Sequence, residues 1–553
     1  MSSKEKEARE LTEAEKASLT KIANEVSEGR KIVGIAVYGS QVAGYATKDS
    51  DYDLIVILED YSPKVKYRYI NGEVDASALV VDREALLMDA DKASLGEFVA
   101  GRLLNIYVPI TGGEVFHEAE IMIKGRVVLE ALEEIEASIG QFAQEIIIPV
   151  EYFLFDKLKK RAAIYPPALY SYSKTYGQEH GRRNTEVSCR GFLEVLKEIA
   201  DEGLITLNGG TVQIKDYEPK HWVTRLTEMA TYTRRSLAQY AVHGYAGRVG
   251  LSIVRREVSS KISRSRKGFE VPDVIKHPRR LWRLQEGLLI IEEDDWFGKL
   301  IEHMGIERGG EVSKNGMGEV YSVTKVYCVN DGSKMVKFAV KNFADAKAFK
   351  WVVLNMWALL SKRFDMGQTS RLQREYSALR RLRGLGFRTP NVLAVALDQR
   401  LLVTEFIEGS DVGQLLPKAL SSDEQALNAV RLYGEALGRV HQEGYTLGDT
   451  KPSNTIFSDG KIYLVDLEQA TYSNDYGWDI AEFIYYSSKF TVDERAVRRL
   501  TKEFLKGYLK HGKKESLTEA LKFKYLAPFQ PILAPNVVRA VRQEIRKNAA
   551  SAQ

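Results

Sequence analysis

The stretches YTLGDTKPSN, residues 445–454, and VDLEQ, residues 465–469, carry the polar residues around which the chain is organised. Asp449 and Asn454 stand five residues apart, and Asp466 follows a short apolar run that predicts a buried strand. A phosphoryl-transfer site needs one carboxylate to orient the acceptor hydroxyl, and an amide oxygen and a second carboxylate to hold magnesium against nucleotide phosphates. The two stretches supply this set in order. The competing interpretation is a polar turn between two strands.

The first stretch matches the pattern D-x-K-P-x-N. This pattern resembles the catalytic loop of the protein-kinase-like superfamily, in particular its atypical branch with the RIO kinases and the kinase of the tRNA-threonylcarbamoylation complex. The resemblance covers about residues 305–530 and implies a two-lobed domain that uses ATP and Mg²⁺. It implies Asp449 and Lys451 as catalytic residues, and Asn454 and Asp466 as magnesium ligands.

Two features depart from ordinary protein kinases. Leu447-Gly448 stands where many of them have His-Arg, and Leu467-Glu468 replaces the Phe-Gly after the metal-binding Asp. In addition, only about a dozen residues separate Asp466 from Asp479, which resembles the structural Asp that hydrogen-bonds the catalytic loop. The long segment that presents a peptide in protein kinases is therefore missing, which argues for another acceptor or for limited autophosphorylation.

The residues before the catalytic loop match the remaining parts of a nucleotide site. Residues 311–342 predict paired strands with a partial glycine-rich loop, and Lys341 matches the phosphate-pairing lysine, with Lys337 as the competing choice. Residues 344–362 predict an apolar helix packed on the small lobe, and residues 401–409 resemble the hinge strand. The nucleotide-binding residues that the resemblance implies are Gly316, Gly318, Lys341, its ion-pair partner Glu375, Glu405 and Ile407.

A second phosphate-chemistry motif lies near the N-terminus, where an apolar strand leads to a Gly-Ser turn and then to a D-x-D sequence. Strand alternation places the two aspartates on one face, where carboxylates can hold a pair of magnesium ions while the turn offers N–H groups to phosphates. Over about residues 30–115 this order resembles the DNA-polymerase-beta-like nucleotidyltransferases. The implied site residues are Gly39, Ser40, Asp51, Asp53 and Asp75. Whether this domain catalyses or only binds stays open.

The middle of the chain predicts helices, a hairpin and a basic surface. Residues 186–201 form an amphipathic pattern, and Asn208-Gly209-Gly210 between alternating strands predicts a hairpin, so the pair resembles the last helix and wing of a winged-helix module. Basic residues dominate between Arg248 and Arg283, which favours a nucleic-acid backbone over a cover for acidic neighbours. The candidate RNA-binding residues are Arg182, Arg183, Arg255, Arg256, Arg264, Arg266, Lys267, Arg279 and Arg280.

Composition limits the class of protein. The 553 residues predict two to four domains, and the net charge of +4 is small for that length, so RNA binding must depend on local patches. The two cysteines stand far apart and imply neither a disulfide framework nor a zinc site. The sequence has no apolar run of about 18 residues, so we expect a soluble, cytoplasmic protein with no membrane contact. The sequence also gives no sign of an obligate protein partner.

The expected architecture is multidomain α+β. It has a nucleotidyltransferase-like domain at residues 1–117, a helical and winged-helix-like basic RNA-binding region at 118–304, and an atypical kinase domain with basic C-terminal helices at 305–553. This order resembles the archaeal tRNA kinases, which transfer the γ-phosphate of ATP to the 2′-hydroxyl of an internal uridine in the tRNA variable loop. The resemblance implies tRNA as the partner. Three alternatives stay open: a RIO-like protein Ser/Thr kinase, a nucleotidyltransferase acting on RNA or protein, and an inactive RNA-binding scaffold.

Overall fold

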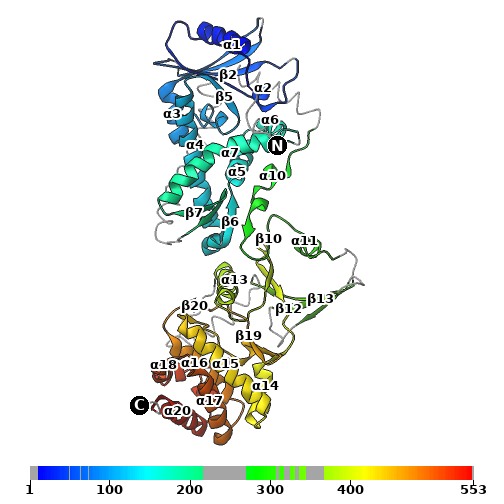
Figure 1. Cartoon of the computed structure of the whole chain (residues 1–553), viewed down its shortest axis with the longest axis vertical. Coiled ribbons are helices and arrows are strands. Elements are labelled where there is room, and N and C mark those ends of the chain that lie inside the picture. Colours follow the sequence, from blue (N-terminus) through cyan, green and yellow to red (C-terminus); the bar gives the residue numbers. More distant parts are fainter. Residues whose placement is uncertain are drawn as a thin grey trace. The chain divides into compact units, whose positions relative to one another are not determined.

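The structure, a computed structural model (Figure 1), describes residues 10–48, 50–62, 64–72, 74–177, 179–215, 269–306, 311–316, 324–330, 335–343 and 367–550. The chain divides into two compact units, Met1–Arg283 and Leu284–Gln553. The multidomain α+β class expected from the sequence is confirmed, with a mixed sheet in each unit.

The sheet of the first unit has five strands in the order β3-β4-β2-β1-β5. β2 pairs antiparallel with β1 but parallel with β4. All of β4 and residues 54–58 of β2 are buried, as expected for strands that are covered on both faces. The strands are β1 (Ile32–Tyr38), β2 (Tyr52–Leu58), β3 (Val65–Ile70), β4 (Ala76–Asp82) and β5 (Tyr107–Thr111).

Helix α1 (Glu13–Val26) packs on this sheet through Leu19 and Ile22. It begins at a capping box, in which the Thr12 hydroxyl accepts from the Glu15 N–H and the Glu15 carboxylate accepts from the Thr12 N–H. This cap sets the start of the helix at Glu13.

The rest of the first unit is helical, with a small second sheet. Its helices are α2 (Ser40–Ala43), α3 (Arg83–Lys92), α4 (Gly113–Ile139), α5 (Glu151–Ile164), α6 (Ala168–Thr175), α7 (Gly181–Asp201) and α10 (Asp273–Lys276). The expected hairpin is formed by β7 (Ile205–Asn208) and β8 (Thr211–Ile214), and β6 (Ile146–Pro149) pairs with β8. The sequence analysis missed β6 as well as β3. Helix α4 runs through residues 117 and 118, so no structural break separates the first two expected domains there.

Glu97 joins the helices of the first unit through a buried ion-pair network. Its carboxylate lies 2.7 Å from Arg126 Nη2, 2.7 Å from Lys157 Nζ and 2.9 Å from Arg161 Nη1. Burial alone would raise the pKa of Glu97, but the three cations outweigh it and hold the pKa well below its ordinary value. The network ties α4 and α5 to the segment after α3.

The small lobe of the second unit is a six-stranded sheet in the order β10-β14-β15-β13-β12-β11. Its strands are β10 (Leu288–Ile290), β11 (Glu311–Gly316), β12 (Thr324–Asn330), β13 (Met335–Asn342), β14 (Val392–Ala396) and β15 (Leu401–Glu405). Helices α11 (Trp296–His303) and α13 (Gln368–Gly384) belong to the same lobe, and β9 (Arg283–Leu284) lies at the junction between the units.

The boundary expected at residues 304 and 305 is wrong, because the second unit begins at Leu284. Strand β10 pairs in parallel with β14 of the small lobe. Ile290 of β10 and Leu300 of α11 are buried in one core with Phe338 and Val403. Residues 284–304 therefore complete the small lobe and do not belong to the middle region.

The large lobe is helical around one three-stranded and one two-stranded sheet. Its helices are α14 (Val412–Leu420), α15 (Glu424–Gln442), α16 (Tyr476–Ser488), α17 (Glu494–Tyr508), α18 (Lys514–Ala520), α19 (Phe523–Leu526) and α20 (Pro535–Ala550). Its strands are β16 (Ser410–Asp411), β17 (Tyr445–Thr446), β18 (Thr455–Ser458), β19 (Lys461–Leu464) and β20 (Thr471–Tyr472). Gly434 lets α15 and α17 approach closely, since a Cβ there would lie 2.2 Å from the Phe504 carbonyl oxygen.

Within the described residues, every helix is too short or too polar to cross a lipid bilayer.

Candidate active site

Helix α16 holds the backbone of the loop that carries Asp449. The buried Asp479 carboxylate accepts hydrogen bonds from the N–H groups of Leu447 (2.6 Å) and Gly448 (2.9 Å). Trp478 Nε1 donates to the Gly448 carbonyl oxygen at 2.9 Å. The structural role expected for Asp479 is therefore confirmed, and the loop before Asp449 has its backbone groups satisfied by one helix.

Glu482, one turn further along α16, fixes the residue after Asp449. Its Oε2 accepts from the Thr450 N–H at 2.7 Å and from the Thr450 hydroxyl at 3.1 Å. Burial, assisted by the charge of Asp449, raises the pKa of Glu482 to about 8. The sequence analysis missed this residue, because nothing in its local sequence distinguishes it from other helical glutamates.

Lys451 pairs with Asp449 inside the loop. Lys451 Nζ lies 2.8 Å from Asp449 Oδ1, and the Asp449 side chain is 8% exposed. Burial would lower the pKa of Lys451, but the carboxylates of Asp449 and Glu482 raise it above its ordinary value. The two predicted catalytic residues thus lie together in the large lobe, with Asp449 buried and Lys451 charged.

The two predicted magnesium ligands are brought together by a backbone bond. The Val465 N–H donates to the Asn454 carbonyl oxygen at 3.1 Å, so Asp466 follows directly beside Asn454. Asn454 Nδ2 donates to the Asp449 carbonyl oxygen at 3.0 Å, and its amide oxygen accepts a long hydrogen bond of 3.4 Å from the Ser453 hydroxyl. An amide oxygen and a carboxylate are hard oxygen ligands of the kind that Mg²⁺ prefers, so the residues present fit the ion.

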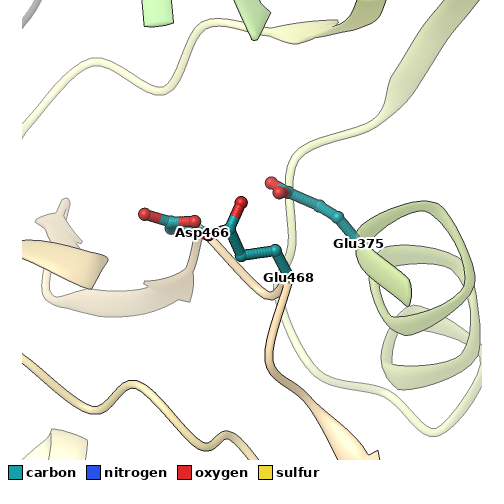
Figure 2. Close-up of side chains that lie close together, drawn as sticks. All are labelled: Glu375, Asp466 and Glu468. Carbon is teal, nitrogen blue, oxygen red and sulfur yellow. The ribbon is translucent and has the colours of Figure 1, made fainter. Parts of the chain in front are cut away.

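Lys341 of β13 lies among three carboxylates. Its Nζ is 2.5 Å from Glu375 Oε2 and 3.0 Å from Glu468 Oε2, and it also pairs with Asp466. The ion pair expected between Lys341 and Glu375 is therefore formed, whereas Lys337 pairs with the exposed Glu408 at 2.6 Å. Figure 2 shows Glu375 reaching from α13 toward Asp466 and Glu468.

Electrostatics within this cluster favours a charged lysine. Burial would lower the pKa of Lys341, but the three carboxylates raise it well above its ordinary value. Burial raises the pKa of Glu375 to about 7, while the Lys341 ammonium outweighs burial at Asp466 and lowers its pKa. The three carboxylates are close enough to hold a metal ion, but the ammonium group of Lys341 already lies between them.

The structure describes some of the other residues predicted to contact the nucleotide. Glu405 ends β15, its N–H donates to the Asn391 carbonyl oxygen at 2.9 Å, and Ile407 follows in the connection to the large lobe. Gly316 ends β11, where it pairs with Lys325 of β12. Gly318 and the helix expected at residues 344–362 lie outside the described residues.

The predicted nucleotidyltransferase residues line one cavity of about 450 Å³ in the first unit. Gly39 has φ +79°, and a Cβ there would lie 2.2 Å from Asp53 Oδ2, so the turn approaches the carboxylate as closely as only glycine allows. Asp51 Oδ2 accepts from the Ser77 hydroxyl at 2.5 Å, and Asp75 Oδ1 accepts from the Gly72 N–H at 3.2 Å. Asp75 precedes β4 by one residue instead of lying within it.

These three aspartates line the cavity together, but their carboxylate oxygens do not all lie within 4.8 Å of one another. Within the described part of the chain, only Glu375, Asp466 and Glu468 bring three such ligand atoms together. Asp53 pairs in register with Ser77 of β4, so a hydroxyl stands beside the second aspartate of the D-x-D motif. The magnesium pair expected on Asp51 and Asp53, with Asp75 as a third carboxylate, stays a prediction.

Comparisons with known proteins match both units. The polymerase beta nucleotidyltransferase family matches residues 20–97, and the RIO domain family matches residues 320–479. The probable serine/threonine-protein kinase BUD32 homolog of Archaeoglobus fulgidus is 31% identical over 155 residues, which are 28% of this chain and 72% of that protein. The chain belongs to the RIO-like kinase family.

Two further matches add less to this RIO-like assignment. The KEOPS complex subunit Bud32 of Pyrococcus abyssi is 34% identical over 101 residues, which are 18% of this chain and 45% of that protein. The chain thus spans less than half the length of that relative. A solved structure, WaaP in complex with acyl carrier protein, aligns at 15% identity over 44% of this chain and 95% of that one. Its TM-score of 0.27 is too low to support an assignment.

The RIO-like unit contains two site residues that the sequence analysis missed, Glu468 and Arg371. Glu468 was noted only as a departure from Phe-Gly, yet it lies 3.0 Å from both Lys341 Nζ and Arg371 Nη2. Arg371 lies on α13, one turn before Glu375. The signal for Glu468 was a carboxylate where kinases have glycine, but its partners come from two distant segments.

The candidate RNA-binding residues of this RIO-like kinase are only partly described. Arg182 has a 94% exposed side chain beside Glu186, whereas Arg183 donates to the Asn184 side chain and to the Val42 carbonyl oxygen. Arg279 stacks on Trp282, and Arg280 lies 3.5 Å from Asp273. Arg255, Arg256, Arg264, Arg266 and Lys267 lie outside the described residues.

Proposed function

We propose that this chain is an ATP-dependent RNA kinase that transfers the γ-phosphate to the 2′-hydroxyl of an internal uridine in the tRNA variable loop. The observation that carries the proposal is the short segment between Asp466 and α16. Its strand β20 pairs with β17, and the Ser473 N–H donates to the Gly444 carbonyl oxygen at 3.0 Å, so the segment is tied down beside the catalytic loop. It offers no long platform for a peptide, which favours a different acceptor.

Each part of the transfer has a residue to perform it. Lys341 would bind phosphate oxygens, and Asn454 and Asp466 would hold Mg²⁺, which neutralises charge that develops on the phosphates. Asp449 would orient the acceptor hydroxyl and accept its proton as the oxygen bonds to the γ-phosphorus and the bond to ADP breaks. Lys451 would neutralise charge on the transferred group.

Two features support RNA as the acceptor. One is the basic sequence between Arg248 and Arg283, and the other is the order of the matched families along the chain, nucleotidyltransferase first and RIO domain second. A folded RNA presents a broad polyanionic surface, which proteins bind by shape and phosphate contacts. The uridine and its 2′-hydroxyl come from the resemblance to the archaeal tRNA kinases alone.

The test uses ATP labelled at the γ or the α phosphate, with bulk tRNA or total protein as acceptor. We expect γ label on tRNA in the wild type and in the Asp51→Ala/Asp53→Ala variant, and no label with Asp449→Ala. Label on protein alone would move the proposal to a RIO-like protein Ser/Thr kinase.

A second candidate function rests on the cavity of the first unit, which gathers Gly39, Ser40 and the acidic residues in one place. That site would transfer a nucleotide to RNA or protein and would place α label on the acceptor. Loss of α label in the Asp51→Ala/Asp53→Ala variant, with Asp449→Ala unaffected, would establish this function in place of the first.

A further inference from the structure

Glu468 is a buried carboxylate held between two cations. Its side chain is 5% exposed, and its Oε2 lies 3.0 Å from Lys341 Nζ and 3.0 Å from Arg371 Nη2. Both cations also lie near the ring of Phe343, at 5.1 Å and 5.5 Å from its centroid. Separating a buried ion pair would leave an uncompensated charge on each member, which costs free energy. Glu468 and Arg371 therefore hold each other in place.

The three carboxylates around Lys341 differ in how freely they can leave it. The side chains of Glu375 and Glu468 are 7% and 5% exposed, whereas that of Asp466 is 41% exposed. An ammonium group has three donors, and three carboxylates surround this one. A phosphate oxygen therefore reaches Lys341 only by replacing a carboxylate, and Asp466 is the one that solvent already reaches.

Resting on the proposed kinase function, we infer that Glu468 is a positioning residue for Lys341. With a phosphate oxygen in place of Asp466, Glu375 would hold the ammonium from α13, and Glu468, fixed by Arg371, would hold it from the segment after Asp466. The lysine then keeps two anchors and directs its third donor to the nucleotide. Glu468 thereby has a positioning role that glycine, which lacks a side chain, cannot have at this position.

Charge alone and positioning predict opposite effects on ATP. A carboxylate near the nucleotide repels the phosphates, so its removal should tighten ATP binding if charge is all that matters. If Glu468 positions Lys341, its removal lets the ammonium settle on Asp466 and Glu375, and ATP binding should weaken. The sign of the change therefore separates the two effects.

The experiment measures the dissociation constant of ATP in EDTA by titration calorimetry on the full chain, which requires neither metal nor turnover. For Glu468→Gln we expect it to rise about tenfold, as for the loss of one charge-assisted hydrogen bond. With Mg²⁺ present, KM for ATP should rise by a larger factor than kcat falls. Glu443→Gln, which removes an exposed carboxylate at the end of α15, should change neither value.

A charge-balanced variant keeps the test decisive if Glu468→Gln unfolds the small lobe. Arg371→Gln/Glu468→Gln removes both members of the pair and leaves the net charge unchanged, and it should weaken ATP binding by a similar factor. Unchanged or tighter binding in a folded variant would overturn the positioning role while the kinase proposal stands. A wild-type chain that does not bind ATP would overturn both.

Discussion

Asp449 is the residue whose loss should separate chemistry from binding. It contacts Lys451 and is 8% exposed, while the surrounding backbone is held by Asp479 and Glu482. For Asp449→Asn we expect kcat to fall by about 10²–10⁴ with the ATP dissociation constant unchanged. Single-turnover kinetics and titration calorimetry measure the two quantities.

The matched control for that prediction is Asp459→Asn. Asp459 is an exposed carboxylate in the turn between β18 and β19, with φ +48°, a conformation that asparagine also tolerates. This variant should retain wild-type kcat. A comparable loss of kcat in both variants would mean that Asp449 contributes only to the charge of the lobe.

Glu482 should make the stability of the second unit fall as pH rises. Its pKa is raised to about 8 in the folded chain, so between the ordinary pKa of glutamate and about pH 8 the folded state binds the proton that the unfolded state releases. The stabilisation that protonated Glu482 contributes is therefore fully present below that ordinary pKa. It is lost as pH rises through the pKa of Glu482 in the folded chain. In Glu482→Gln this loss should be smaller by on the order of 1–3 kcal/mol, measured as the unfolding free energy between pH 5 and pH 8.

Part of the loss should remain in that variant, because the pKa of Glu375 is also raised, to about 7. Stability that rises with pH over this range in the wild type would contradict both assignments.

At single residues, the sequence identified the members of the site whose spacing the chemistry dictates. The five-residue interval between Asp449 and Asn454 is local, and Lys341 and Glu375 stand where a strand and a helix are expected to meet. Glu468, Arg371 and Glu482 were missed, because a carboxylate acquires a role only when folding brings a distant cation or backbone N–H to it. No local pattern encodes that partner.

Among the elements, the helices α4 and α5 depend on the ion-pair network of Glu97. For Glu97→Gln we expect a loss of about 3 kcal/mol in the free energy of unfolding, since three cations would keep only a neutral partner. Differential scanning calorimetry should detect this as a lower unfolding temperature of the first unit. Glu59→Gln, which removes an exposed carboxylate 2.7 Å from Lys31, should leave that temperature unchanged.

An unchanged unfolding temperature in Glu97→Gln would mean that apolar packing alone joins these helices.

Elements with a strong sequence signal, such as a cap or a turn motif, were predicted well, and strands without one were not. The capped helix α1 and the hairpin of β7 and β8 follow their sequence signals closely. Strand β6 was missed because its apolar run lies between two helical patterns, and β3 because its alternation was not counted as a strand. Strand β3 pairs with β4, the next strand along the chain, whereas β6 pairs with the distant β8.

For the whole molecule, the basic sequence between Arg248 and Arg283 should bind RNA through phosphates. In Arg264→Gln/Arg266→Gln/Lys267→Gln, the slope of log affinity for tRNA against log salt should become shallower by up to about 2–3. Fluorescence anisotropy over a series of salt concentrations measures it. Lys31→Gln, which removes a cation already paired with Glu59, should leave the slope unchanged.

If the slope were unchanged in the triple variant, the phosphate contacts would lie elsewhere and the basic segment would not be the RNA surface.

The division into units was predicted only in outline. Local motifs reveal the nucleotidyltransferase-like and the kinase-like regions. The boundary at Leu284 depends on the packing of β10 and α11 in the small-lobe core, which is a tertiary contact. The acceptor is likewise not encoded in any single motif.

The most direct test of the account is the chemical position of the transferred phosphate. After reaction with γ-labelled ATP, the tRNA is hydrolysed in alkali, which cleaves RNA through attack by each free 2′-hydroxyl. A phosphate on an internal 2′-oxygen blocks that attack, so we predict that the label appears in one alkali-resistant dinucleotide and is absent with Asp449→Asn. Label released in mononucleotides, found at an RNA end or found only on protein would contradict the account.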